Sequence, residues 1–149
     1  MDVSGTIRAI LNQKSREVFS TSPDTTVFEA IELMDAKNVG ALLVVKQERL
    51  VGVISERDYT RKVALHGKSS KDTLVNEVLS PGLLVATPHT TIEESMRIMT
   101  EHRVRHLPVL DGDTLVGLVS IGDLVNWIIS AQSVEIDQLH SYIAGQYPG

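Results

Sequence analysis

The sequence predicts a layered α/β fold made of two β-α-β-β-α repeats that are related by a pseudo-twofold axis. The first observation behind this is an internal duplication. Residues 23–58 match residues 88–123 at a constant offset of 65 positions, and thirteen of the thirty-six aligned residues are identical. The second observation is that apolar residues follow helix and strand periods in the same order in both copies. Such a gap-free match identifies a repeated structural unit.

Each copy carries the same series of predicted elements. A short strand ends at a proline, and a helix with one apolar face starts near Thr25 in the first copy and near Thr90 in the second. Two apolar runs separated by four polar residues then predict a hairpin, and a closing helix follows. The predicted strands are 18–21, 41–45 and 50–54, then 83–86, 106–110 and 115–119, and the closing helices are 55–65 and 120–129.

Further helices are predicted at 6–13, at 73–79 and at 133–143, where the last belongs to neither repeat. Residues 66–72, rich in Lys, Ser and Gly, form the expected linker. The expected divisions are a first repeat at 6–65, a second at 73–129, and a C-terminal helix and tail at 133–149. A small sheet covered by helices on one face is bare on the other, so we expect the repeats to cover each other and to share a cleft.

Composition excludes several classes of function. The chain has no Cys, so disulfides, thiol catalysis and cysteine metal sites are excluded. A net charge of −5 argues against a nucleic-acid partner, which would require a basic face. No apolar run is long enough to span a membrane and the first residues do not resemble a signal peptide, so a cytoplasmic location is expected. The scattered histidines and the lack of a nucleophile motif predict neither a metal site nor an enzyme.

The residues that indicate chemistry are two Ser-x-x-Asp turns, Ser55 to Asp58 and Ser120 to Asp123. Each follows a strand and opens a helix, so the serine is expected at the N-cap and the aspartate in the first turn. Free N–H groups at a helix start attract a phosphate, and an aspartate can accept two hydrogen bonds from the cis-diol of a ribose. The pair of turns predicts a ribonucleotide site, although one such turn alone is more often a simple capping motif.

A phosphate beside an aspartate also requires a cation. Arg57 and Arg61 are placed to serve the first turn, whereas the aligned positions of the second copy carry no charge. Arg105 and His106, at the start of a strand that leads to the cleft, are the expected substitutes. The two turns should therefore differ in affinity or in ligand.

Two features resemble a known family. Gly-x-x-Ser-x-x-Asp occurs at 52–58 and at 117–123, and the run 105–109 (Arg-His-Leu-Pro-Val) is similar to a second-strand signature. Both resemble the paired cystathionine-β-synthase (CBS) domain, or Bateman module. The chain's final residues, 142–149, look like the tail of small bacterial proteins that consist of this pair alone. The first repeat departs from the signature, because residues 40–44 read Gly-Ala-Leu-Leu-Val.

The resemblance implies binding of an adenosine ligand (AMP, ADP, ATP, NAD or S-adenosylmethionine) in the cleft. It implies that Asp58 and Asp123 hold ribose hydroxyls and that Ser55 and Ser120 touch phosphate. Residues implied to line the base pocket are Ser20, Thr21, Ser22, Ala86 and Thr87. It also implies a homodimer in which two pairs form a flat disc of four repeats.

We therefore expect a non-enzymatic nucleotide sensor that acts in signal transduction through a ligand-dependent change in the dimer. An effector protein would read that change. The alternative is a purely structural dimerisation or adaptor module whose cleft binds no ligand. Apolar residues on more than one side of the helix over 123–129 favour a homodimer in either case.

Overall fold

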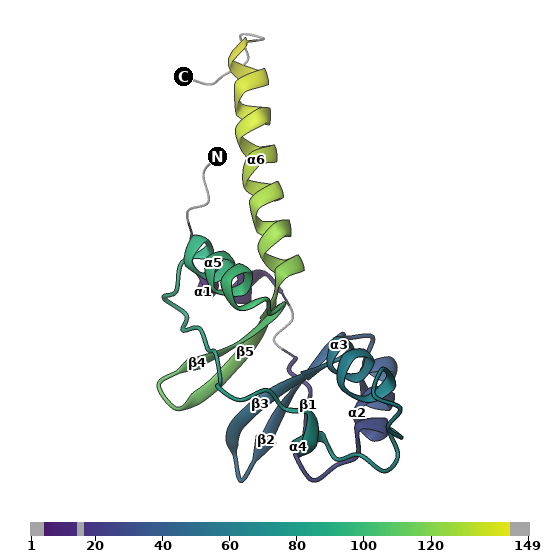
Figure 1. Ribbon diagram of the computed structural model, residues 1–149. Coiled ribbons are helices and arrows are strands. Elements are labelled where there is room, and N and C mark those ends of the chain that lie inside the picture. Colours follow the sequence, from purple (N-terminus) through teal and green to yellow (C-terminus); the bar gives the residue numbers. More distant parts are fainter. Residues whose placement is uncertain (1–4, 15–16, 144–149) are drawn as a thin grey trace.

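The computed structural model describes residues 5–14 and 17–143, which form two halves and a long projecting helix (Figure 1). The first half contains a three-stranded sheet in the order β1-β2-β3. Strand β1 (Ser20–Thr21) pairs parallel to β2 (Ala41–Lys46), and β2 pairs antiparallel to β3 (Arg49–Ser55). Helix α2 (Val27–Lys37) connects β1 to β2.

The second half repeats this plan. Helix α5 (Ile92–His102) precedes the antiparallel pair β4 (His106–Asp111) and β5 (Thr114–Ser120). Both hairpins shift register at the same aligned place, between Val44 and Val45 and between Val109 and Leu110. The two-repeat α/β architecture predicted from the duplication is confirmed.

Capping residues explain where the two long connecting helices begin. The hydroxyl oxygen of Thr26 accepts a hydrogen bond from the N–H of Glu29, and that of Thr91 accepts one from Glu94. These contacts satisfy N–H groups that the first turn leaves free. Both helices end at a residue in the left-handed conformation, Asn38 in α2 and Arg103 in α5.

Four predicted elements differ from the structure. The helices expected at 120–129 and 133–143 are a single helix, α6 (Ile121–Ile143), because no Gly or Pro interrupts the residues between them. The strand expected at 83–86 is reduced to one bridge between Ala86 and Val109. The helix expected at 55–65 is a short α3 (Glu56–Asp58) followed by a π-helical segment, η1 (Tyr59–Ala64).

The two short helices are exchanged between the halves. Helix α1 (Ile7–Gln13) packs in the core of the second half, and α4 (Val75–Val78) packs in the core of the first. The exchange is fixed by backbone hydrogen bonds, from the N–H of Ile7 to the carbonyl of Thr90 (2.9 Å) and from Val75 to Thr25 (2.8 Å). Each half is therefore completed by a helix that precedes the other half in the sequence.

The glycine of each Gly-x-x-Ser-x-x-Asp motif lies under a leucine from an exchanged helix or the residue after it. A Cβ at Gly52 would lie 3.0 Å from the Cδ2 of Leu79, and one at Gly117 would lie 2.7 Å from the Cδ2 of Leu11. No larger residue fits without displacing the leucine. The motif glycine is thus explained by packing of the exchanged helices against strands β3 and β5.

One buried polar atom distinguishes the two cores. Ser95 in α5 is fully buried, and its hydroxyl has no hydrogen-bond partner among the described residues. The aligned residue of the first repeat is Ala30, which is fully buried too. We expect Ser95→Ala to raise the free energy of unfolding by about 1 kcal/mol, because it removes an unsatisfied buried hydroxyl. Urea denaturation measures this, with Ala30→Ser as the reverse exchange that should destabilise; a loss of stability in Ser95→Ala would contradict it.

Within the described residues, no helix has both the length and the apolar character that crossing a membrane requires.

Candidate functional site

A cavity of about 510 Å³ lies between the two halves. The first half contributes β3, the Ser55–Asp58 turn and η1, and the second contributes the loop that joins α5 to β4. The segment that follows α4 closes one side. Its lining includes Val51, Val53, Ser55, Glu56, Arg57, Asp58, Arg61, Lys62, Leu79, Ser80, Leu83, Leu84, His102, Arg103, Arg105 and His106.

The Ser55–Asp58 turn is a reciprocal capping box, as its sequence predicted. The N–H of Ser55 donates to the Oδ2 of Asp58 (2.8 Å), and the N–H of Asp58 donates to the Oγ of Ser55 (3.3 Å). The next amide, that of Glu56, donates to the carbonyl of Gly40 (3.1 Å). These bonds fix the carboxylate of Asp58 at the edge of the cavity.

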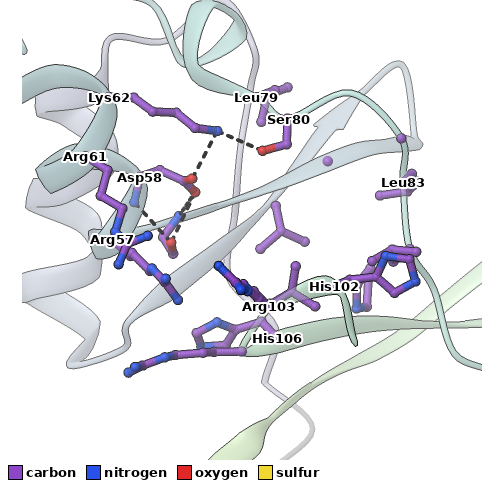
Figure 2. Close-up of a pocket in the computed structure, with 18 of the residues that line it drawn as sticks. Arg57, Asp58, Arg61, Lys62, Leu79, Ser80, Leu83, His102, Arg103 and His106 are labelled. Carbon is purple, nitrogen blue, oxygen red and sulfur yellow. Dashed lines mark hydrogen bonds and ion pairs between the residues drawn. The ribbon is translucent and has the colours of Figure 1, made fainter. Parts of the chain in front are cut away.

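Basic side chains from both halves surround this carboxylate. Arg57, Arg61 and Lys62 come from the helical segment after β3, and Arg103 comes from the α5–β4 loop across the cavity (Figure 2). Arg105, from the same loop, also lines the cavity. His102 and His106 add two further nitrogen-bearing rings, whereas the only acids that the described residues contribute to the lining are Glu56 and Asp58. On a chain of net charge −5, the positive charge of these Lys and Arg side chains creates a local site for an anion.

Lys62 connects Asp58 to the exchanged segment. Its Nζ lies 3.3 Å from the Oδ1 of Asp58 and donates to the Oγ of Ser80 (2.8 Å; Figure 2). It also donates to the carbonyl of Val78 (2.8 Å). The Oδ2 of Asp58 accepts the bonds from Ser55, whereas Oδ1 faces Lys62. The contact between Oδ1 and Lys62 is long and partly exposed to solvent, which makes it weak. A ligand hydroxyl can therefore approach Oδ1.

The second turn is built in the same way but has a different surrounding. The N–H of Ser120 donates to the Oδ2 of Asp123 (2.8 Å), and the N–H of Asp123 donates to the Oγ of Ser120 (3.1 Å). Lys14, which follows α1, donates to the same Oδ2 (2.7 Å) and to the carbonyl of Leu118 (2.9 Å). Ser120 and Asp123 do not line the cavity.

The pKa of Asp123 reflects this ion pair. Burial alone would raise the pKa of the carboxyl, but the hydrogen bonds from Lys14 and Ser120 together lower it below its usual value. The second turn is thus held in its ionised form by a lysine of the chain itself.

His106 lies within the electrostatic reach of both turns. Its pKa is lowered mainly by burial, and the charges of Lys14 and Arg105 lower it further, whereas Asp123 and Asp58 oppose the shift. It is paired with Ser120 across the β4–β5 hairpin and lines the cavity. At neutral pH this imidazole is therefore mostly uncharged and available as one donor and one acceptor.

The cavity brings together some of the residues that the sequence predicted as ligand contacts. Ser55, Arg57, Asp58, Arg105 and His106 line it together with the earlier candidate cation Arg61. The residues predicted as contacts that lie outside its lining are Ser20, Thr21, Ser22, Ala86, Thr87, Ser120 and Asp123. Several of these have structural roles, since Ala86 is buried in the core and the hydroxyl of Thr87 lies 3.3 Å from that of Thr90. Their contact with a ligand stays a prediction.

Sequence reasoning missed Lys62, Ser80, Leu83, His102 and Arg103. Ser80 and Leu83 reach the cavity because they follow the exchanged helix α4, and Lys62 is bonded to that segment, which no local pattern reveals. His102 and Arg103 align with residues 37 and 38 of the first repeat, which lie outside this cavity. The one sequence feature that could have indicated their place at the site is their basic character at the end of α5. No group of three or more acidic, histidine or cysteine side chains that could hold a metal occurs among the described residues.

Removing Lys14 should change how stability depends on pH. A carboxyl with a lowered pKa stabilises the fold above the unfolded-state value, 3.8, and this contribution is lost as pH falls through the lower folded-state value. We expect Lys14→Met to cost at most about 1 kcal/mol at pH 7, because the pair is partly exposed, and to cost less near pH 3. Urea denaturation at several pH values measures this, with exposed Lys68→Met as the control. A loss that is independent of pH would contradict the ion-pair interpretation.

Comparison with known proteins identifies the family. The sequence pattern of the CBS domain matches residues 7–65 and again 75–130. The chain is 38% identical to the CBS domain-containing protein CBSX3, mitochondrial, of Arabidopsis thaliana, over 97% of this chain and 74% of that protein. It is 35% identical to the CBS domain-containing protein YhcV of Bacillus subtilis, over 78% of this chain and 82% of that protein. A solved Burkholderia ambifaria structure, described as a signal-transduction protein with CBS domains, is 45% identical and superposes with a TM-score of 0.82, covering 86% of this chain and 96% of that one. The chain therefore belongs to the CBS-domain family and carries a tandem pair of CBS domains, the Bateman module.

Proposed function

We propose that this protein is a regulatory sensor that binds one adenine nucleotide, of the AMP, ADP, ATP or NAD class, in the cavity between its two CBS domains. Tandem CBS domains are regulatory, ligand-binding modules in signalling, and the Burkholderia neighbour is described as a signal-transduction protein. The observation that carries the proposal is the fixed Ser55–Asp58 turn, which faces a cavity rich in Lys, Arg and His.

Each part of a nucleotide has a matching part of the cavity. The Oδ1 of Asp58 accepts hydrogen bonds from the ribose hydroxyls, while its Oδ2 stays bonded to Ser55. Arg57, Arg103 and Arg105 neutralise the phosphates from two sides of the cavity. The purine lies against apolar side chains, which form the remaining wall: Val51, Val53, Leu79, Leu83 and Leu84.

This assignment moves the base pocket away from the residues implied by the family resemblance. Ser20, Thr21 and Ser22 belong to or follow β1, and Ala86 is buried beside β4, where it bridges to Val109. The apolar residues of β3 and of the 79–84 segment are therefore the better support for a base. The second turn, with Lys14 already on Asp123, is the weaker candidate. We therefore expect one nucleotide per chain at low ligand concentration.

Signalling follows from the position of the cavity between the halves. A nucleotide held by Asp58 in the first half and by Arg103 and Arg105 in the second stabilises one relative placement of the two domains. An effector protein, or the second chain of a homodimer, reads that placement. The ligand acts through differential binding, and the module itself transforms no substrate.

Titration calorimetry of the full chain with AMP, ADP, ATP, NAD, S-adenosylmethionine and adenosine tests the proposal. We expect phosphate-bearing nucleotides to bind with one ligand per chain, to raise the melting temperature, and to bind at least about 10-fold more tightly than adenosine. The affinity of ATP should fall as salt screens the arginines. No heat and no thermal shift from any ligand, with protein that is folded by circular dichroism, would leave a purely structural module.

A further inference from the structure

Helix α6 extends beyond the domain that it completes. Its first part packs in the core of the second half through Leu124 and Ile128, which are buried. The remainder projects away from both halves (Figure 1). The helix has 23 residues in all. More than half of its length therefore extends past this chain's own core.

Exposed apolar residues follow a heptad along α6. Val125, Ile129, Ile136 and Leu139 are exposed by 42, 54, 54 and 56%, and Gln132 falls between them at the same spacing. The steps along the sequence alternate between four and three residues, and an isoleucine at 143 continues them. An alternation of four and three gives the 3.5-residue repeat of a coiled-coil seam. We call positions 125, 129, 132, 136 and 139 the α6 seam.

The seam is distinct from the face that packs on the core. Leu124 and Ile128 precede Val125 and Ile129 by one residue, which turns them about 100° around the helix axis. Solvent exposure separates the two sets in the same way, since the first pair is buried and the second is not. The apolar residues of the α6 seam therefore remain exposed, while the face with Leu124 and Ile128 packs on the core.

We propose that the α6 seam pairs with the same seam of a second copy to form a parallel two-stranded coiled coil. The heptad identities support two strands, because the a positions 129 and 136 are both isoleucine and Leu139 occupies a d position. This combination of Ile at a and Leu at d favours dimers over higher oligomers. The interaction goes beyond nucleotide sensing and uses a surface outside the cavity.

Gln132 supports the parallel orientation. In a parallel pair each d residue faces the d residue of the other helix, so the amides of the two Gln132 side chains can hydrogen-bond to each other. In an antiparallel pair a d residue faces an a residue, which would bury the amide of Gln132 against isoleucine. The parallel arrangement satisfies the one polar residue among the seam positions of the sequence.

The seam has fewer than three heptads, so we expect the exposed Ile121, at the start of α6, to add to the contact between the two chains.

Cysteine cross-linking tests both whether α6 pairs with a second copy of the chain and whether the two helices are parallel. The chain has no Cys, so an introduced cysteine is the only one that can react. Leu139→Cys in the full chain, treated with oxidised glutathione, should give a disulfide-linked dimer. Ser130→Cys, exposed on another face of α6, should not. An antiparallel pair would separate the two residues at 139, so a Leu139→Cys chain that stays uncrosslinked, or crosslinks no more than Ser130→Cys, overturns the proposal.

Sedimentation equilibrium tests whether the seam drives association. We expect a dimer of the unmodified chain at micromolar concentration, and a dissociation constant at least about 10-fold higher for Ile136→Glu than for Ser130→Glu. Position 136 lies beyond the core contacts of α6, and an unchanged melting temperature for the two domains would show that the variant still folds. The pairing should be strong enough to give a dimer at about 50 µM. A monomer of the unmodified chain at this concentration overturns the proposal, as does a dimer that Ile136→Glu does not weaken.

Discussion

Asp58→Asn is expected to weaken ATP binding by about 10- to 100-fold and to leave the protein folded. The change keeps the shape of the side chain but removes the charge that accepts the ribose hydroxyls. Hydrogen bonds to a charged group contribute about 1.5–3 kcal/mol, which corresponds to this range of dissociation constants. Titration calorimetry at constant salt measures the affinity, and thermal melting reports the stability of the variant.

The duplication supplies a matched control. Asp123 occupies the same place in the second turn, makes the same two backbone–side-chain bonds with its serine, and lies outside the cavity lining. Asp123→Asn should therefore change ATP affinity by less than about 3-fold, a difference below the contribution of one such hydrogen bond. An effect of Asp123→Asn as large as that of Asp58→Asn would place the ligand at the second turn. Normal binding by Asp58→Asn would remove Asp58 from the site.

Elements that depend on local sequence were predictable. Thr26 and Thr91 mark the starts of their helices, and Ser55 and Ser120 form the capping turns, because each of these contacts joins residues only three positions apart. The hairpins followed from alternating apolar runs and polar turns. In each case the decisive interactions lie within one short window of the chain, where side-chain type and spacing are enough.

The exchange of α1 and α4 was not predictable in that way. Both helices have an apolar face that could pack on either repeat, and order in the sequence suggests that each belongs to the repeat it precedes. The choice is made by contacts between distant residues, such as Ile7 with Thr90 and Val75 with Thr25. Long-range packing decides between two arrangements that local patterns treat as equal.

The same limit applies to the candidate site. Asp58 and Asp123 look equivalent in the sequence, yet only Asp58 lies at the cavity. Asp123 is paired with Lys14, which follows α1 and is more than one hundred residues away in the chain. Aligning the two repeats predicts two equal turns, because the alignment compares residue types and not the residues packed around them. The difference between the turns arises from the unduplicated residues that pack around them, Arg103 and Lys14 above all.

Gly117→Val is expected to lower the free energy of unfolding by about 2–3 kcal/mol, the upper range for overpacking a core. A Cβ at this position would already lie 2.7 Å from the Cδ2 of Leu11, and valine adds two methyl groups. Leu11 is 6% exposed and belongs to α1, whose start is bonded to Thr90. The strain therefore falls on the contact that holds the exchanged helix in place. Urea denaturation measures the change.

A double-mutant cycle separates this clash from a general effect of valine in the strand. Leu11→Ala alone should destabilise by about 2–3 kcal/mol, because it leaves a cavity under α1. In the double variant the smaller alanine makes room for the valine introduced at position 117, which fills part of the space left by the leucine. The combined loss should then be at least about 1 kcal/mol smaller than the two single losses added together. If the two losses simply add, the contact with Leu11 is not the reason for a glycine at position 117. The motif glycine would then need an explanation other than the exchanged helix.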